Sequence, residues 1–111
     1  TVIAKRTAKI KICFDLLSNN IAEKGKQEIY FRIISPEAKV LSEDPENPVT
    51  FMHPDIKTQV EYTTMEIVNF ENKKINVCKN WEVPDSLFPG IYFIEIFTKE
   101  NKLGIATLSL R

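Results

Sequence analysis

The hydrophobic positions of this chain recur at every second residue in one segment after another. Between residues 8 and 16 they alternate with lysines and an aspartate, which is typical of a strand with one solvated face. Residues 28–34 repeat the pattern with Ile29, Phe31 and Ile33 in phase. No apolar spacing of 3.6 residues is sustained over about 11 positions, so at most one short helical turn is predicted. The apolar positions of the first strand are Ala8, Ile10, Ile12, Phe14 and Leu16.

Turn signals divide the rest of the chain into further short strands. Residues 35–39 read as a proline-containing turn and residues 42–48 as a polar loop. The apolar residues of the longest segment, 58–70, do not keep one phase, which predicts a β-bulge near Ile67 and Val68. Seven or eight short strands in this arrangement predict an all-β fold. The further strands are expected at residues 40–41 (briefly), 49–52, 58–70, 75–81, 91–98 and 103–110.

The segment before the penultimate strand carries the most specific motif, Leu-Phe-Pro-Gly-Ile-Tyr at residues 87–92. It is similar to the tyrosine corner of immunoglobulin-like domains, where a tyrosine hydroxyl turns back to the backbone a few residues upstream. A crossover between sheets leaves backbone groups without partners, and a buried phenol can satisfy one of them. A tyrosine packed on a hairpin without that bond is the alternative. We predict an immunoglobulin-like antiparallel β-sandwich of seven to eight strands with Pro89, Gly90 and Tyr92 as its structural corner.

Three short motifs resemble the C-terminal β-sandwich domain of uncharacterised bacterial coiled-coil proteins of the envelope or scaffold type. They are residues 30–39, where Ala38 stands in place of the usual glycine, the Val-Cys-Lys-Asn-Trp segment 77–81, and residues 89–110. Together they cover nearly the whole chain. The resemblance implies a tethered, non-catalytic module of the cell envelope or periplasm, and it brings no catalytic residues. The residues themselves leave the compartment undecided.

Composition narrows the classes of partner. The 111 residues suit one domain, with residues 8–111 as the β-sandwich and residues 1–7 as the remnant of a linker from a longer chain. Fifteen basic residues balance fifteen acidic ones, whereas nucleic-acid binding usually needs a basic surplus to displace counterions. No apolar run approaches the ~18 residues of a membrane span. We therefore expect neither nucleic-acid binding nor membrane insertion by this fragment.

Residues able to carry out chemistry are sparse. His53 is the only histidine and has a single neighbouring carboxylate, Asp55, whereas metal sites and nucleophilic triads need more partners. The acidic loop around Glu43 and Asp44 lacks the spacing that wraps a chain around calcium. We therefore predict no enzyme, no metal and no cofactor.

The two cysteines, Cys13 and Cys78, are too few for a disulfide framework. Cys13 lies on the solvated phase of its strand, and Cys78 is out of phase with Val77 and Trp81. We predict two free thiols, with a single bridge between them as the alternative.

The last hairpin is apolar on both faces, although a solvated antiparallel face should be mostly polar. Tyr92, Ile94 and Ile96 are expected to fill the core, and so are the alternating residues 106, 108 and 110. The outer apolar residues predict an interaction face that docks another protein subunit, for example as a homodimer, or the upstream region of the same chain. The alternative is that the loop 49–56 folds over this face. The candidate interface residues are Ile91, Phe93, Phe97, Leu103 and Ile105.

These observations favour a non-enzymatic interaction or structural module at the C-terminus of a longer bacterial protein. The first alternative is a carbohydrate- or other ligand-binding module, in which Tyr30, Tyr62 and Trp81 would stack on a sugar ring. Trp81, however, shares its phase with Ile75 and Val77, which favours a place in the core. An accessory domain of an enzyme is the second alternative.

Overall fold

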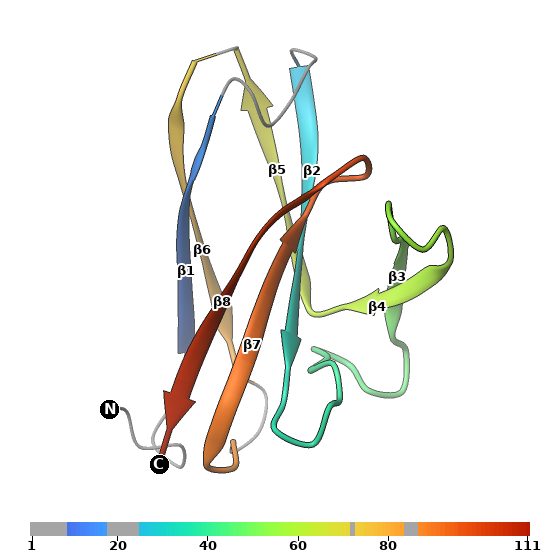
Figure 1. Cartoon of the computed structure of the whole chain (residues 1–111), viewed down its shortest axis with the longest axis vertical. Coiled ribbons are helices and arrows are strands. Elements are labelled where there is room, and N and C mark those ends of the chain that lie inside the picture. The colour runs from blue at the N-terminus through green and yellow to red at the C-terminus, as the bar shows by residue number, and fades with distance from the viewer. Residues whose placement is uncertain (1–8, 18–24, 72, 84–86) are drawn as a thin grey trace.

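The computed structural model describes residues 9–17, 25–71, 73–83 and 87–111 of the chain (Figure 1). Within these ranges every regular element is a strand, and every strand pairing is antiparallel. The predicted all-β fold of seven or eight strands is confirmed, and the expected strand at 40–41 is reduced to one bridge between Ile34 and Val40. The strands are β1 (Lys9–Leu16), β2 (Gly25–Ile34), β3 (Val49–Met52), β4 (Gln59–Tyr62), β5 (Thr64–Phe70), β6 (Ile75–Glu82), β7 (Gly90–Phe97) and β8 (Lys102–Leu110).

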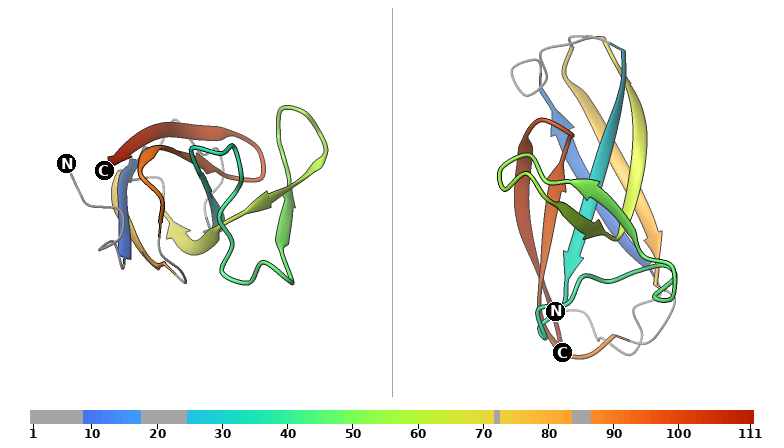
Figure 2. Two further views of the ribbon diagram at one scale, coloured as in Figure 1. Left: turned by 90° about the horizontal axis from the view of Figure 1, so that it is seen from below. Right: turned by 90° about the vertical axis from the view of Figure 1, so that its right-hand side faces the viewer.

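The strands form two facing layers and a separate hairpin. The larger sheet has the order β5-β2-β7-β8, the smaller one consists of β1 and β6, and β3 pairs only with β4 among the described residues. The β3–β4 hairpin projects away from the larger sheet, as the left-hand view of Figure 2 shows. Ile10, Ile12 and Trp81 from the smaller sheet pack against the inner side chains of β2 and β7. The fold is therefore sandwich-like, with its main core between the two sheets.

The burial of side chains follows the predicted phases. In β1, Ile10, Ile12 and Leu16 are buried while Lys9 and Lys11 are exposed. In β2, Ile29, Phe31 and Ile33 are fully buried. Trp81 of β6 is also buried, as its phase predicted.

The segment 58–70 differs from its prediction, because it is split into β4 and β5 and has no bulge at Ile67 and Val68. Both residues pair in regular register with β2. The break lies at Thr63, whose amide donates to the carbonyl of Phe31 (2.7 Å). The amide of Ile33 then donates to the Thr63 hydroxyl (2.9 Å), so a side-chain oxygen continues the pairing where the backbone turns away. The mixed phase arises because β5 has apolar side chains on both faces. Val68 and Phe70 pack between the sheets, whereas Met65 packs against Phe51 and Phe97 on the outer face and Ile67 is exposed.

The prediction of two free thiols is wrong, because Cys13 and Cys78 form a disulfide. They are directly opposite in the β1–β6 pair, and their Cα atoms are 4.1 Å apart. Both cysteines do lie on the exposed face, as their phases indicated. Opposite outward positions on neighbouring antiparallel strands face one another, which sequence phase alone could not show.

Removing this disulfide should destabilise the domain without changing its fold. The bridge links residues 65 positions apart, so it limits the entropy of the unfolded chain. We expect the double substitution Cys13→Ser/Cys78→Ser to lower the free energy of unfolding by about 2–4 kcal/mol in urea denaturation. Thiol titration of the unfolded, unreduced wild type should find no free thiol. Two titratable thiols per chain would contradict the bridge.

Candidate functional site

The corner before β7 is held by the hydroxyl of Tyr92, which donates to the carbonyl of Phe88 (2.7 Å). This is the hydrogen bond that the motif predicted. Tyr92 is almost fully buried, and this burial raises the pKa of its phenol, so the hydroxyl stays a donor at neutral pH. The corner therefore anchors the start of β7, the strand on which three of the candidate interface residues lie.

Gly90 packs against the turn that follows β2. Its φ is +138°, and a Cβ atom on it would lie 2.5 Å from Cγ of Pro36. A side chain here would be strained by the backbone conformation and would also collide with the proline ring. Gly90 thus lets the turn at residues 35–39 close on the corner.

An apolar pocket of about 310 Å³ lies beside this corner at the end of the sandwich. Trp81 and Leu87 contribute to its wall, and Glu37 and Lys39 also line it. Trp81 is itself buried, and its indole N–H donates to Glu43 (3.1 Å). Tyr30, in contrast, packs with Phe51 and Phe97 rather than in the main core that contains Trp81. The three aromatic residues expected for a sugar platform are thus not brought together.

Three charged residues cross the outer face of the larger sheet. Glu95 of β7 accepts from Arg32 of β2 and from Lys102 of β8, at 2.9 Å in each case. Arg32 also donates to the carbonyl of Glu61 on β4 (2.9 Å). Sequence reasoning missed this network, although Arg32 and Glu95 are directly opposite once β2 and β7 are paired. The network separates two apolar regions of the face.

On one side of the network lies the aromatic cluster, which we define as Tyr30, Phe51 and Phe97. The rings of Tyr30 and Phe51 stack with centroids 4.4 Å apart, and the ring of Phe97 lies 5.5 Å from Phe51. Phe97 is 0% exposed, so its assignment to an open interface is wrong. The physical reason is the β3–β4 hairpin, which folds over this part of the face. The alternative of a covering segment at residues 49–56 is thus confirmed here, and only here.

Leu103 is the second candidate that the structure removes from the interface. The register between β7 and β8 shifts at Phe97, where Lys102 is its partner and Gly104 is the partner of Ile96. Leu103 is therefore the extra residue of a β-bulge and packs against the core instead of the outer face. The isolated Gly104 inside the strand pattern is the sequence signal that marks this bulge.

Three candidate residues remain in the open, two of them beyond the network on β7 and one, Ile105, directly opposite Glu95 on β8. Ile91 is 53% exposed, Phe93 44% and Ile105 58%. We call these three side chains the hairpin patch. A shallow apolar groove of about 390 Å³ adjoins them, lined by Ile34 and Pro36 together with Ile91 and Phe93. Of the five residues predicted for the interface, three are thus exposed.

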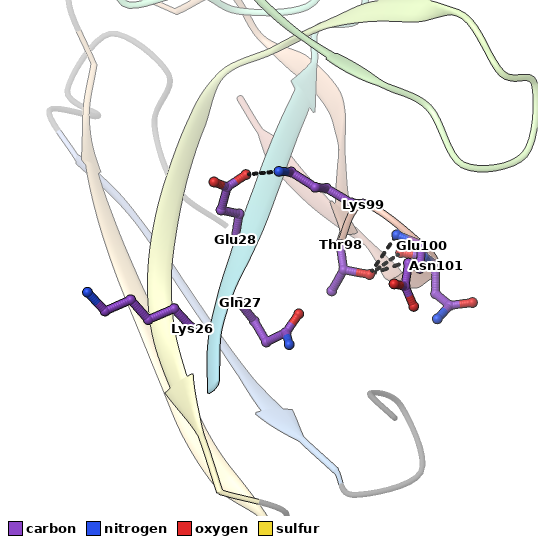
Figure 3. A pocket seen from close by; sticks show the side chains of 7 residues that line it. All are labelled: Lys26, Gln27, Glu28, Thr98, Lys99, Glu100 and Asn101. Carbon is purple, nitrogen blue, oxygen red and sulfur yellow. Dashed lines mark hydrogen bonds and ion pairs between the residues drawn. The ribbon is translucent and has the colours of Figure 1, made fainter. Parts of the chain in front are cut away.

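A further recess lies between β2 and the β7–β8 turn, and several of its polar groups pair with one another (Figure 3). Glu28 accepts from the hydroxyl of Tyr30 and pairs with Lys99 (3.1 Å). These interactions hold the pKa of Glu28 below its usual value, while burial and the bond to Glu28 raise the pKa of Tyr30. Thr98 accepts from the amides of Glu100 and Asn101. The recess of about 140 Å³ is thus a self-paired turn rather than a set of groups poised for chemistry.

His53 belongs to the β3–β4 hairpin. Its Nδ1 accepts from the amide of Asp55 (3.1 Å), and its ring lies 4.8 Å from that of Phe97. Its observed role is thus to close the hairpin turn and border the aromatic cluster. Across residues 9–17, 25–71, 73–83 and 87–111, no three His, Cys, Asp or Glu side chains are grouped as a metal site would need. The same residues include no helix long and apolar enough to span a membrane.

Fold and site together define an all-β, antiparallel, sandwich-like domain with an open apolar patch on its last hairpin. The family model of a domain of unknown function, DUF8428, matches residues 1–111, so the chain belongs to this family. No curated protein and no solved structure matches the chain.

The corner hydrogen bond can be tested by removing one oxygen atom. We expect Tyr92→Phe to lower the free energy of unfolding by about 1–3 kcal/mol, because the hydrogen bond from the buried tyrosine to the carbonyl of Phe88 is lost. Tyr62→Phe is the matched control, since Tyr62 is only partly buried, and its effect should stay within about 0.5 kcal/mol. Denaturant titration at constant slope measures both. Equal midpoints for Tyr92→Phe and wild type would show that the bond contributes nothing.

Proposed function

We propose that this domain is a non-enzymatic interaction module of immunoglobulin-like type, which docks a protein partner through the hairpin patch. The observation that carries the proposal is the uneven covering of one sheet face. The chain's own β3–β4 hairpin buries Phe97 completely, while Ile91 and Phe93 on the same strand stay about half exposed. Neighbouring apolar side chains left open on a sheet face are a common mark of interaction sites.

The immunoglobulin-like assignment is supported by the corner. A tyrosine two residues after a glycine, bonded to a carbonyl four residues upstream, is the arrangement found at the start of strand F in such domains. The facing of a four-stranded sheet and a two-stranded sheet is consistent with a reduced version of that sandwich.

A location in the cell envelope or outside the cell is supported by the disulfide. Structural disulfides persist mainly in oxidising compartments. The Cys13–Cys78 bridge lies on the exposed face of its strand pair, where cytosolic reductants would reach it. An envelope module tethered to a longer chain would meet an oxidising environment.

The proposed docking is tested by changing the patch alone. We expect Ile91→Ser/Phe93→Ser to weaken association with the upstream region of the parent chain at least tenfold, because the exposed apolar area is lost. Sedimentation velocity of the domain with the upstream region added as a separate polypeptide measures this. The unfolding midpoint should change little, since both side chains are about half exposed.

Ile67→Ser provides the matched control. Ile67 is 57% exposed and lies on β5 of the same sheet, away from the patch. Its substitution should leave association unchanged. Loss of association in the control as well, or equal association of the patch variant and wild type, would contradict docking through the patch.

A further inference from the structure

The outer edge of β8 has no partner strand within the described ranges, where only β7 pairs with it. Such an edge presents a row of backbone donors and acceptors, and proteins usually protect it with charges, proline or a short strand. The regular part of β8 after the bulge, Gly104–Leu110, contains no charged residue and no proline. The edge strand β5, in contrast, carries Glu66 in an ion pair with Lys79 of β6 (3.0 Å). The stretch of the β8 edge after the bulge thus lacks the charges and proline that protect other edges.

The inner face of β8 is also incompletely covered. Ala106 and Gly104 are opposite the core residues Ile94 and Ile96, so they lie on the inner face. Ala106 is nevertheless exposed, and Leu108 is only partly buried. The smaller sheet therefore leaves a gap beside β8, next to two small residues.

We propose that the β8 edge pairs with β8 of a second copy of this chain, in antiparallel register about a two-fold axis at Thr107. The axis follows from the bulge, because the regular stretch from residue 104 to residue 110 has Thr107 at its centre. A two-fold axis there pairs the whole stretch with itself. An axis at any other residue pairs a shorter stretch, or brings the bulged residue Leu103 into the ladder.

This register matches small residues with large ones across the seam. Ala106 lies opposite Leu108 of the second copy, and Gly104 lies opposite Leu110 of the second copy. The exposed gap beside Ala106 is thereby filled by a leucine. On the outer face Thr107 lies opposite Thr107 of the other copy, a cross-strand pair that favours antiparallel sheets. Such self-complementarity is what an isologous two-fold contact requires.

Charge does not oppose this contact. The chain has no net charge at pH 7, and the paired stretch has no charge of its own. Phe93 is opposite Thr107, so the two hairpin patches lie on the same face on either side of the seam, with Thr107 and Ser109 of each copy between them. The inference thus rests on the proposed interaction role and extends it: the second copy occupies the edge, and both patches stay open to the docking partner. A seven-residue edge contact is small, so we expect a dissociation constant of about 1–100 μM.

A cysteine at the proposed axis tests the register directly. Opposite Cα atoms of paired antiparallel strands are about 4.5–5.5 Å apart, which is within reach of a disulfide. We expect Thr107→Cys, under mild oxidation, to give a disulfide-linked dimer that denaturing electrophoresis resolves. Ile105→Cys is the matched control, because two copies of residue 105 lie about 14 Å apart in this register. Ile105→Cys should cross-link only when mixed with Ser109→Cys. Equal cross-linking of the Thr107 and Ile105 variants would overturn the register.

A charge on the edge separates this inference from docking by the patch. We expect Ala106→Lys to weaken the dimer at least tenfold in sedimentation equilibrium and to leave the monomer folded, because Ala106 is exposed. Ile91→Ser/Phe93→Ser should keep the dimer. A wild type that stays monomeric at millimolar concentration would overturn edge pairing and leave patch docking intact. A dimer that the patch variant dissolves and Ala106→Lys preserves would place the second copy on the patch instead.

Discussion

The central strands of the larger sheet carry apolar side chains on both faces, and the rest of the structure depends on how that surface is covered. The inner face of β2 and β7 packs against the smaller sheet. The outer face has no second sheet, so the β3–β4 hairpin provides a partial cover and buries Phe97 beneath Phe51 and His53. A four-residue hairpin pair is too short to cover the whole face. The hairpin patch is the part of the outer face that the β3–β4 hairpin leaves exposed.

The way the β3–β4 hairpin is joined to the larger sheet explains how much of the outer face it covers. Thr63 replaces a backbone partner of β2 with its hydroxyl, and so releases β4 from the sheet plane without leaving the amide of Ile33 unpaired. Arg32 then bonds to the backbone of β4 at Glu61 and to Glu95 on β7. This charged network limits the aromatic cluster on the side of the patch. The ion pair of Arg32 and Glu95 is largely buried, and separating its partners would leave an unpaired charge. The network therefore forms a polar boundary between the covered and the open regions of the face.

Sequence alone predicted most of the strands and the inner residues of the core, because a period of two assigns every residue of a regular strand to one face. It failed where a strand is irregular, and where the burial or pairing of a residue depends on a neighbouring strand. Leu103 turned inward because of a bulge beside the isolated Gly104, which a period of two does not describe. Phe97 was covered by a hairpin whose position in space the period of two does not encode. For the cysteines the phases were right, yet only the β1–β6 register shows that the two outward positions coincide. The sequence therefore predicted that apolar residues lie on the outer face of the hairpin, but not which of them remain exposed.

The backbone at the start of β7 is therefore held in place more firmly than the backbone along the free edge of β8. At the β7 entry, the Tyr92 hydrogen bond and the contact of Gly90 with Pro36 fix the backbone, so Ile91 and Phe93 are presented on a rigid strand. At the β8 edge nothing described restrains the outer backbone groups, and the small residues Gly104 and Ala106 leave space beside the core. An exposed apolar strand and a neighbouring strand edge without charge or proline each favour association. The two features together support the interaction role that we propose for the last hairpin.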